Sequence, residues 1–145
     1  MGYYLQGLIS RENVLKTHTS EYQNVTVIPL VQGVGLVPLI DEAFEEIGPD
    51  DVMEPFEKLS SDVEELAQKI SVDCPVIYVE AEFFGGTGTQ VLMAWAKGSR
   101  TMKPLKSTDA INQGLKILGV KKHGAVDEFD AVGLGKHRST EEWIK

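Results

Sequence analysis

The chain has 145 residues, of which 42% are hydrophobic and 25% charged, and its formal net charge is −8. This length fits a single domain, residues 1–145, that buries a sizeable core, and the ordinary composition argues against a disordered chain. The excess of acid argues against a nucleic-acid partner, because nonspecific affinity for nucleic acid comes from basic residues that replace counterions.

Two further features bear on location. The longest apolar-rich stretch, residues 25–40, is interrupted by prolines and glycines. No membrane-spanning helix is therefore expected there, since such a helix needs about 20 consecutive apolar residues. Cys74 is the only cysteine, and the N-terminus lacks a basic stretch followed by a long apolar run. Together these features predict a cytoplasmic protein in a reducing compartment, with no membrane partner.

The first predicted elements are a strand, a helix and a second strand. Apolar residues alternate over residues 3–9, which predicts a strand, and Ser10 is expected to cap a short helix that runs to about residue 18. β-Branched residues predict the second strand over residues 24–32. Pro29 inside this strand has no backbone donor, which places the strand at a sheet edge or at a bulge.

Two helices are expected next. Apolar residues at helical spacing predict a helix over residues 40–47, and Gly48 ends it. A longer helix is expected over residues 55–70, with an apolar stripe toward the core and acids on its other sides. Pro55 suits the first turn of that helix, where a missing N–H costs nothing.

The clearest local pattern is a β-hairpin. Apolar and polar residues alternate over residues 76–84 and again over 90–97, which predicts two antiparallel strands. The glycine-rich loop at residues 85–88 joins them. It lacks the Gly-Lys-Ser/Thr of a P-loop and leads into a strand rather than a helix. A structural turn is therefore favoured over a phosphate-binding site.

The remaining elements complete an α+β fold. Ser107 or Thr108 is expected to cap a helix that Gly119 closes. Residues 127–135 predict a short strand or a turn, and a capping box at residues 139–142 opens a last helical turn. We therefore expect an antiparallel sheet of about four strands with the hairpin at its centre, packed by four or five helices.

Charge is unevenly distributed along the chain. Residues 41–65 hold eleven acids and one base, Lys58, whereas residues 97–122 hold seven bases and one acid. A dense acidic surface attracts a basic partner and speeds encounter, so a protein partner such as a basic toxin domain is expected. The candidate contact residues are Asp41, Glu45, Asp50, Asp51 and Glu54. The alternative is two well-solvated helical faces without a partner.

A carboxylate cluster is a second candidate site. Glu80 and Glu82 lie two apart on a predicted strand and so share one face, and paired carboxylates can perform acid–base chemistry when their pKa values separate. Asp127 and Asp130 are the further acids of this cluster. Convergence of all four in a cleft is the requirement for a small enzyme. Otherwise they form solvated or ion-paired surfaces, and no residue is assigned as catalytic.

No cofactor or metal is expected. The chain has no cysteine pair, no His-Glu-x-x-His sequence and no calcium-loop pattern. Asp73 precedes Cys74, and a neighbouring acid raises a thiol pKa, which argues against a cysteine nucleophile.

The second half of the chain resembles a known class of proteins. Its motifs are Glu82-Phe-Phe-Gly-Gly-Thr-Gly-Thr-Gln90, Ile111-Asn-Gln-Gly-Leu115, Leu118-Gly-Val120, Asp127-Glu-Phe-Asp130 and Gly133-Leu-Gly-Lys-His-Arg-Ser139, with Trp143. In these motifs, residues 76–145 are similar to small bacterial immunity-type proteins, which neutralise polymorphic or contact-delivered toxins. The resemblance implies a cytoplasmic, non-enzymatic inhibitor that docks on a toxin, and it transfers no catalytic residue.

Self-association is the third alternative. The apolar segment at residues 31–39 and the predicted edge strand could join copies of an accessory subunit, because an unpaired sheet edge is a template for pairing. The sequence leaves the oligomeric state, the strand order and the identity of the partner open.

Overall fold

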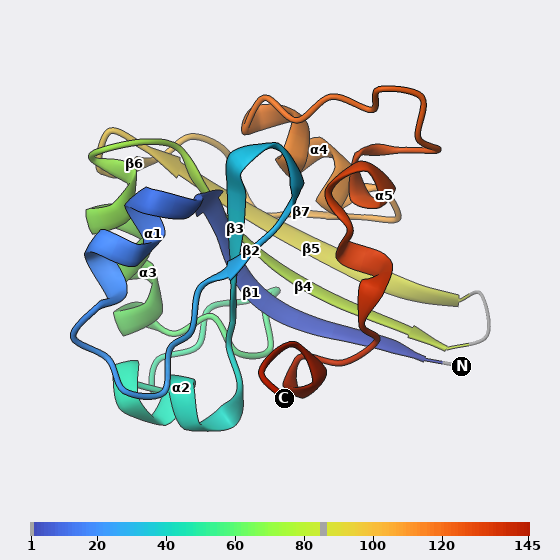
Figure 1. The fold of residues 1–145 in the computed structure, drawn as a ribbon. Coiled ribbons are helices and arrows are strands. Elements are labelled where there is room, and N and C mark those ends of the chain that lie inside the picture. The colour runs from blue at the N-terminus through green and yellow to red at the C-terminus, as the bar shows by residue number, and fades with distance from the viewer. Residues whose placement is uncertain (1, 85–86) are drawn as a thin grey trace.

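The fold has three layers, in which helices cover both faces of one antiparallel sheet. The computed structural model describes residues 2–84 and 87–145, except for the side chain of Thr87. The strands are β1 (Tyr3–Arg11), β2 (Ile28–Pro29), β3 (Val34–Pro38), β4 (Val76–Phe84), β5 (Thr87–Ala96), β6 (Ser99–Arg100) and β7 (Leu105–Ser107). The helices are α1 (Glu12–Thr19), α2 (Asp41–Ile47), α3 (Ser61–Ser71), α4 (Ala110–Ile117) and α5 (Glu128–Val132). These elements make a single α+β domain, as predicted (Figure 1).

The sheet has the strand order β2-β3-β1-β4-β5-β6, with β7 also paired to β5. Its seven strands in the described residues exceed the predicted four. The prediction missed β3, β6 and β7, of which β6 and β7 are two and three residues long. It missed β3 because Gly33, Gly35 and Pro38 suggested a loosened backbone, whereas all five residues of β3 are buried. Pro29 does lie in an edge strand, β2, which confirms its predicted place.

The predicted hairpin is confirmed at the centre of the sheet. β4 pairs antiparallel with β5 in a register that runs from Val76 opposite Trp95 to Phe84 opposite Thr87. β1 lies on the other side of β4 and pairs with it from Tyr3 to Ile9. Residues 85–86 of the predicted glycine-rich loop lie outside the described residues.

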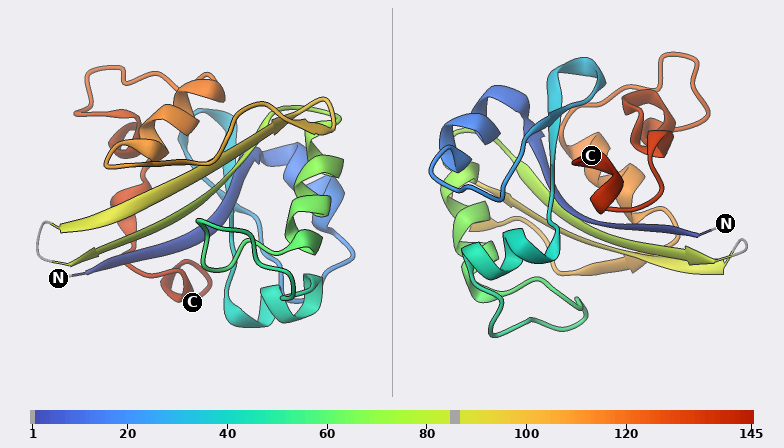
Figure 2. Two further views of the ribbon diagram at one scale, coloured as in Figure 1. Left: turned by 180° about the vertical axis from the view of Figure 1, so that it is seen from behind. Right: turned by 60° about the horizontal axis from the view of Figure 1, so that its bottom comes forward.

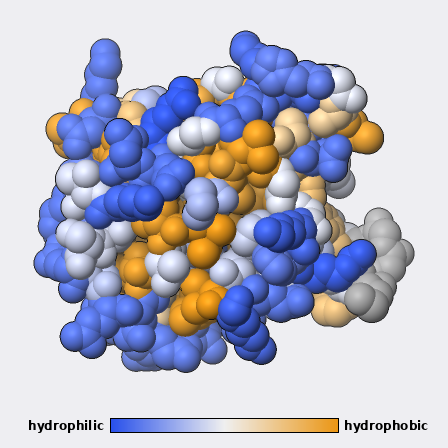
Figure 3. Space-filling model, in the orientation of Figure 1, coloured by the Kyte–Doolittle hydropathy of each residue, from blue (hydrophilic) through white to orange (hydrophobic). Residues whose placement is uncertain are grey.

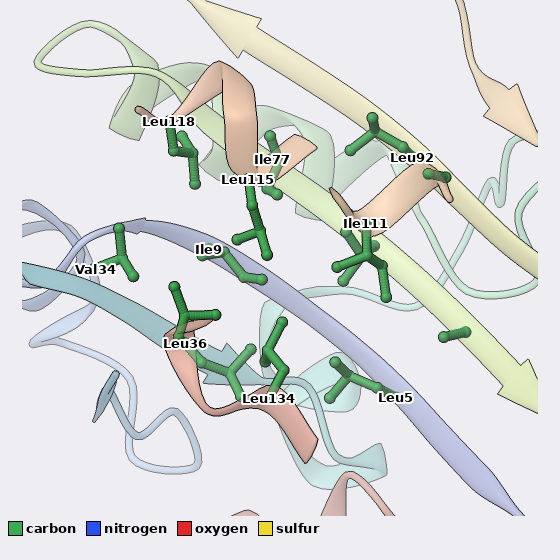
Figure 4. Packing of buried hydrophobic residues seen from close by; sticks show 14 of the residues in the cluster. Leu5, Ile9, Val34, Leu36, Ile77, Leu92, Ile111, Leu115, Leu118 and Leu134 are labelled. Carbon is green, nitrogen blue, oxygen red and sulfur yellow. The ribbon is translucent and has the colours of Figure 1, made fainter. Parts of the chain in front are cut away.

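The two faces of the sheet bury separate hydrophobic cores, because side chains alternate along each strand. Helix α4, helix α5 and the C-terminal segment cover one core, in which Leu5, Ile9 and Ile77 meet Ile111 and Leu115 (Figure 4). Helices α1, α2 and α3 cover the other core (Figure 2). The central strands are therefore apolar on both sides, which is the pattern of a sheet covered on both faces.

Three predicted helix starts are wrong. Ser10 belongs to β1, where its hydroxyl donates to the carbonyl of Pro75 at 2.7 Å, and α1 starts after Arg11. The helix predicted from Pro55 begins at Ser61, with the Ser60 hydroxyl accepting from the Val63 amide at 3.1 Å. Asp109, not Ser107 or Thr108, precedes α4, and no side chain caps that helix. A polar residue near the start of a helix is thus a weak predictor of the first helical residue, because its side chain can form tertiary contacts instead of a cap.

Residues 127–135, predicted as a short strand or a turn, contain helix α5 (Glu128–Val132) and the start of a 3-10 turn at Leu134–Lys136. The Asp127 carboxylate accepts from the Asp130 amide at 2.8 Å and caps α5, and Gly133, at a φ of +88°, ends it. Val132 and Leu134 are buried. The predicted last turn is a 3-10 turn at Glu141–Trp143. No helix in residues 2–84 or 87–145 is both long and apolar enough to cross a membrane.

Candidate functional site

An acidic hollow lies beside α2, at the loop that leads from this helix to α3. It measures about 310 Å³ and is lined by Asp41, Phe44, Glu45, Pro49, Val52, Glu57 and Lys58. We call this surface the acidic hollow. Its apolar part combines a buried Phe44 ring with Val52, which is 42% exposed. Carboxylates on its rim and an apolar floor give it the two features that a lysine or arginine side chain binds: negative charge and a surface for the methylene stem.

Helix geometry brings the first two acids together. Asp41 and Glu45 are four residues apart in α2, so they lie on the same side of that helix. Phe44 fixes the helix against the core. Gly48 ends α2 at a φ of +132°, and its N–H donates to the Phe44 carbonyl at 2.8 Å. The chain then turns back along the rim of the hollow.

A buried carboxylate holds the far side of the hollow in place. Glu80 on β4 is 7% exposed and accepts from the amides of Glu57 and Lys58, at 2.8 and 2.9 Å. Its second oxygen also accepts from the Tyr78 hydroxyl at 2.7 Å. Burial raises the pKa of Tyr78, so this phenol remains a donor. Glu80 therefore anchors the loop that carries Glu57 and Lys58 to the sheet.

The hollow already holds one ammonium group, that of Lys58. The Lys58 Nζ lies 2.7 Å from the Asp41 carboxylate and 5.6 Å from the centroid of the Phe44 ring. The hydrogen bond to Asp41 raises the pKa of Lys58. An ammonium over an aromatic face and beside a carboxylate is the arrangement by which proteins bind cationic groups.

The five predicted contact residues divide into two groups. Asp41 and Glu45 line the hollow, although Lys58 neutralises Asp41. Asp50, Asp51 and Glu54 are exposed on the loop outside its lining, and no ion pair joins them to a base within residues 2–84 and 87–145. The prediction of contact residues missed Glu57, which lines the hollow in a loop whose amides at Glu57 and Lys58 donate to the distant Glu80.

Other acids of the segment at residues 41–65 serve the fold. Glu46 accepts from the amides of Gln23 and Asn24, at 2.8 and 2.7 Å. Glu64 accepts from the Trp95 indole at 2.9 Å and from the Arg100 guanidinium. Fewer than eleven acids are therefore available to a partner. Glu45 and Glu57 line the acidic hollow, whereas five further exposed acids lie outside its lining: Glu42, Asp50, Asp51, Glu54 and Asp62.

The second predicted cluster is not brought together. Glu80 and Glu82 line a small polar cavity with Tyr4, Gln6 and Lys106. Asp127 belongs to a separate cavity beside Asn112 and Phe129, and Asp130 is exposed on α5. α5 packs on the opposite face of the sheet from the helices that adjoin Glu80. The four carboxylates thus do not share a cleft, and Glu80 is committed to three donors.

Two further features place limits on the alternatives. Within the described ranges, no group of three or more His, Cys, Asp or Glu side chains could hold a metal ion. The apolar segment at residues 31–39 is mostly interior, since Val34 to Leu39 are buried and Val31 alone is 56% exposed. That segment contains β3, the strand next to the edge strand β2, and most of its apolar side chains are buried.

Comparisons with protein-family models, with curated proteins and with solved structures found no match for this chain. The functional argument therefore depends on the geometry and charge of the acidic hollow.

Proposed function

We propose that this protein is a non-enzymatic binding protein that docks a basic partner protein through the acidic hollow, in the manner of an immunity-type toxin inhibitor. The observation that carries the proposal is the placement of Lys58, whose ammonium sits on Asp41 and over Phe44. A site that holds its own lysine in this way has the chemistry to hold a lysine or arginine of a partner. The immunity role itself comes from the resemblance of residues 76–145.

The energetics assign different roles to the charges and to the apolar floor. An exposed ion pair contributes only about 0.2–1 kcal/mol, so Glu45 and Glu57 alone cannot supply a tight complex. A group of carboxylates around a binding site does raise the rate of association with a cationic partner, and salt screens this effect. The apolar part of the hollow, which includes Phe44 and the exposed Val52, supplies contact area for a long side chain.

A cationic peptide tests the hollow directly. We expect tetralysine to shift the NMR amide signals of residues 41–58 in a saturable manner at low salt, and tetraglutamate to leave them unchanged. The double substitution Glu45→Gln and Glu57→Gln should weaken this binding. Glu21→Gln with Asp130→Asn is the matched control, because it removes the same charge from exposed sites away from the hollow. Equal weakening by the two double variants would contradict a localised site.

Removing Lys58 makes the opposite prediction. Lys58→Met removes the ammonium that pairs with Asp41, so tetralysine should bind about two- to fivefold more tightly, the effect of one exposed ion pair. Lys97→Met is the control, since Lys97 is an exposed lysine on another part of the surface. An unchanged affinity in Lys58→Met would show that Lys58 does not occupy the cation site.

The biological role is tested with the product of the adjacent reading frame. If that product carries a toxin domain, we expect the two proteins to associate with an on-rate that falls steeply as salt is raised. We also expect co-expression of this chain to restore growth, and the Glu45→Gln/Glu57→Gln variant to slow association. An on-rate that is equal at low and high salt argues against docking through the acidic hollow.

A further inference from the structure

A second hollow lies on a different part of the surface, between the edge strand β2 and the C-terminal segment. It measures about 460 Å³, and we call it the C-terminal groove. Leu30, Val31 and Trp143 contribute apolar walls, and Lys136, His137 and Lys145 contribute basic groups. Apolar side chains are gathered in the middle of the face that carries β2, with hydrophilic groups beside them (Figure 3).

Trp143 in this groove has a donor without an acceptor. The side chain is 7% exposed, and its indole Nε1–H is the one buried side-chain nitrogen or oxygen without a hydrogen-bond partner among the described residues. The His137 ring packs edge-on against the indole, with the centroids 4.7 Å apart. A buried donor left unpaired costs about 1–3 kcal/mol. Because the nitrogen itself is buried, a ligand in the groove meets the ring of Trp143 rather than this N–H.

The strand edge at the groove is poorly suited to a peptide that adds a strand. β2 is only two residues long, and the Leu30 amide is already used by the Val34 carbonyl at 2.9 Å. Pro29, the residue before Leu30, has no N–H to offer. Strand addition depends on such main-chain donors and acceptors. A volume of about 460 Å³ is instead in the range of small-molecule sites.

The charge of the groove selects the sign of the ligand. Two lysines, Lys136 and Lys145, line it in a chain whose net charge is −8. We propose that the C-terminal groove binds a small amphipathic anion, an apolar chain or ring that carries one carboxylate. The apolar part lies against Leu30, Val31 and the ring of Trp143, and the carboxylate pairs with Lys136 and Lys145. This site is separate from the acidic hollow and does not depend on the proposed docking function.

Octanoate is the probe, and the indole signals of the two tryptophans are the readout. The chain has Trp95 and Trp143, so the ¹⁵N-labelled protein gives two indole cross-peaks, and Trp143→Phe identifies which belongs to Trp143. We expect octanoate to shift the Trp143 indole cross-peak in a saturable manner, because the ligand lies against the ring of this tryptophan. Trp95, whose indole already donates to Glu64 on the other side of the sheet, should not respond. Octanol and octylammonium should bind more weakly than octanoate.

Matched lysine variants distinguish octanoate binding in this groove from nonspecific attraction of an anion to surface lysines. Lys136→Gln with Lys145→Gln should weaken octanoate binding about three- to tenfold, the effect of two exposed charge pairs. Lys116→Gln with Lys121→Gln removes the same charge from exposed positions outside the groove and should leave the affinity unchanged. All four lysines are exposed, so neither variant disturbs the core. The proposal is overturned if octanoate gives no saturable shift at Trp143, if octanol binds equally well, or if both double variants behave alike.

Discussion

Replacing Glu80 by glutamine removes one charge at the point where the sheet holds the loop of the acidic hollow. The two oxygens of Glu80 accept from two consecutive amides, those of Glu57 and Lys58, and from the Tyr78 hydroxyl. A glutamine has one acceptor oxygen and one NH₂ group. Whichever way its amide is turned, one of the two backbone N–H groups faces another donor instead of an acceptor.

The size of the effect follows from burial. Glu80 is 7% exposed, so water does not readily replace the lost acceptor. A buried donor left unpaired costs about 1–3 kcal/mol, and a hydrogen bond to a charged group contributes about 1.5–3 kcal/mol. The remaining oxygen of the glutamine still accepts at least one of the three hydrogen bonds, so the loss is partial. We therefore expect Glu80→Gln to lower the free energy of unfolding by about 2–4 kcal/mol.

Urea unfolding followed by circular dichroism measures this loss, and Glu82→Gln is the control. Glu82 lies two residues along the same strand and on the same face, and it is more exposed than Glu80. Its substitution should change stability by less than about 0.5 kcal/mol. We also expect Glu80→Gln to weaken tetralysine binding, because Glu57 and Lys58 are no longer held. A stability within about 0.5 kcal/mol of the parent protein would refute the anchoring role of Glu80.

Three further predictions concern pH and packing. The hydrogen bond from Arg100 lowers the pKa of Glu64 below its ordinary value of 4.5, so ionised Glu64 stabilises the fold above pH 4.5. That stability is lost as pH falls through the lowered pKa, and Glu64→Gln should flatten the acid limb of a stability–pH profile. Burial raises the pKa of Tyr78 above 10.0, so unfolding is promoted above pH 10.0, where the unfolded phenol ionises. Tyr78→Phe should reduce the dependence of urea midpoints on alkaline pH. Gly114→Ala places a Cβ 2.7 Å from a Leu92 methyl carbon. Overpacking costs about 1–3 kcal/mol and outweighs a helix-propensity gain of about 1 kcal/mol, which a lower melting temperature would reveal.

Local patterns predicted the strands that lie at the centre of the sheet. Residues 3–9, 76–84 and 90–97 alternate strongly and form β1, β4 and β5. The hairpin was predicted because β4 and β5 are separated by only a short loop in the sequence. The helix at residues 40–47 was predicted within one residue, because an apolar spacing ends at Gly48. These elements depend on neighbouring residues, and the chain itself supplies that information.

Boundaries that depend on distant contacts were predicted poorly. Ser10 resembles a helix cap, but its hydroxyl bonds to Pro75, 65 residues away. Pro55 resembles a first helical residue, but Glu80 binds the following amides of Glu57 and Lys58 and keeps this segment in a loop. In both places a partner remote in sequence competes with the local preference, and the partner prevails.

In the candidate site, too, some features follow from the local sequence and others only from contacts between distant residues. The sequence by itself established the uneven charge, predicted the α2 helix and named Asp41 and Glu45 as candidate contacts. Only the tertiary structure decided which acids remain available, because hydrogen bonds to distant groups commit Glu46, Glu64 and Glu80 to the fold. It also decided that Lys58 enters the hollow. Charge can be counted along a chain, but its availability to a partner depends on which side chains folding brings within hydrogen-bond distance.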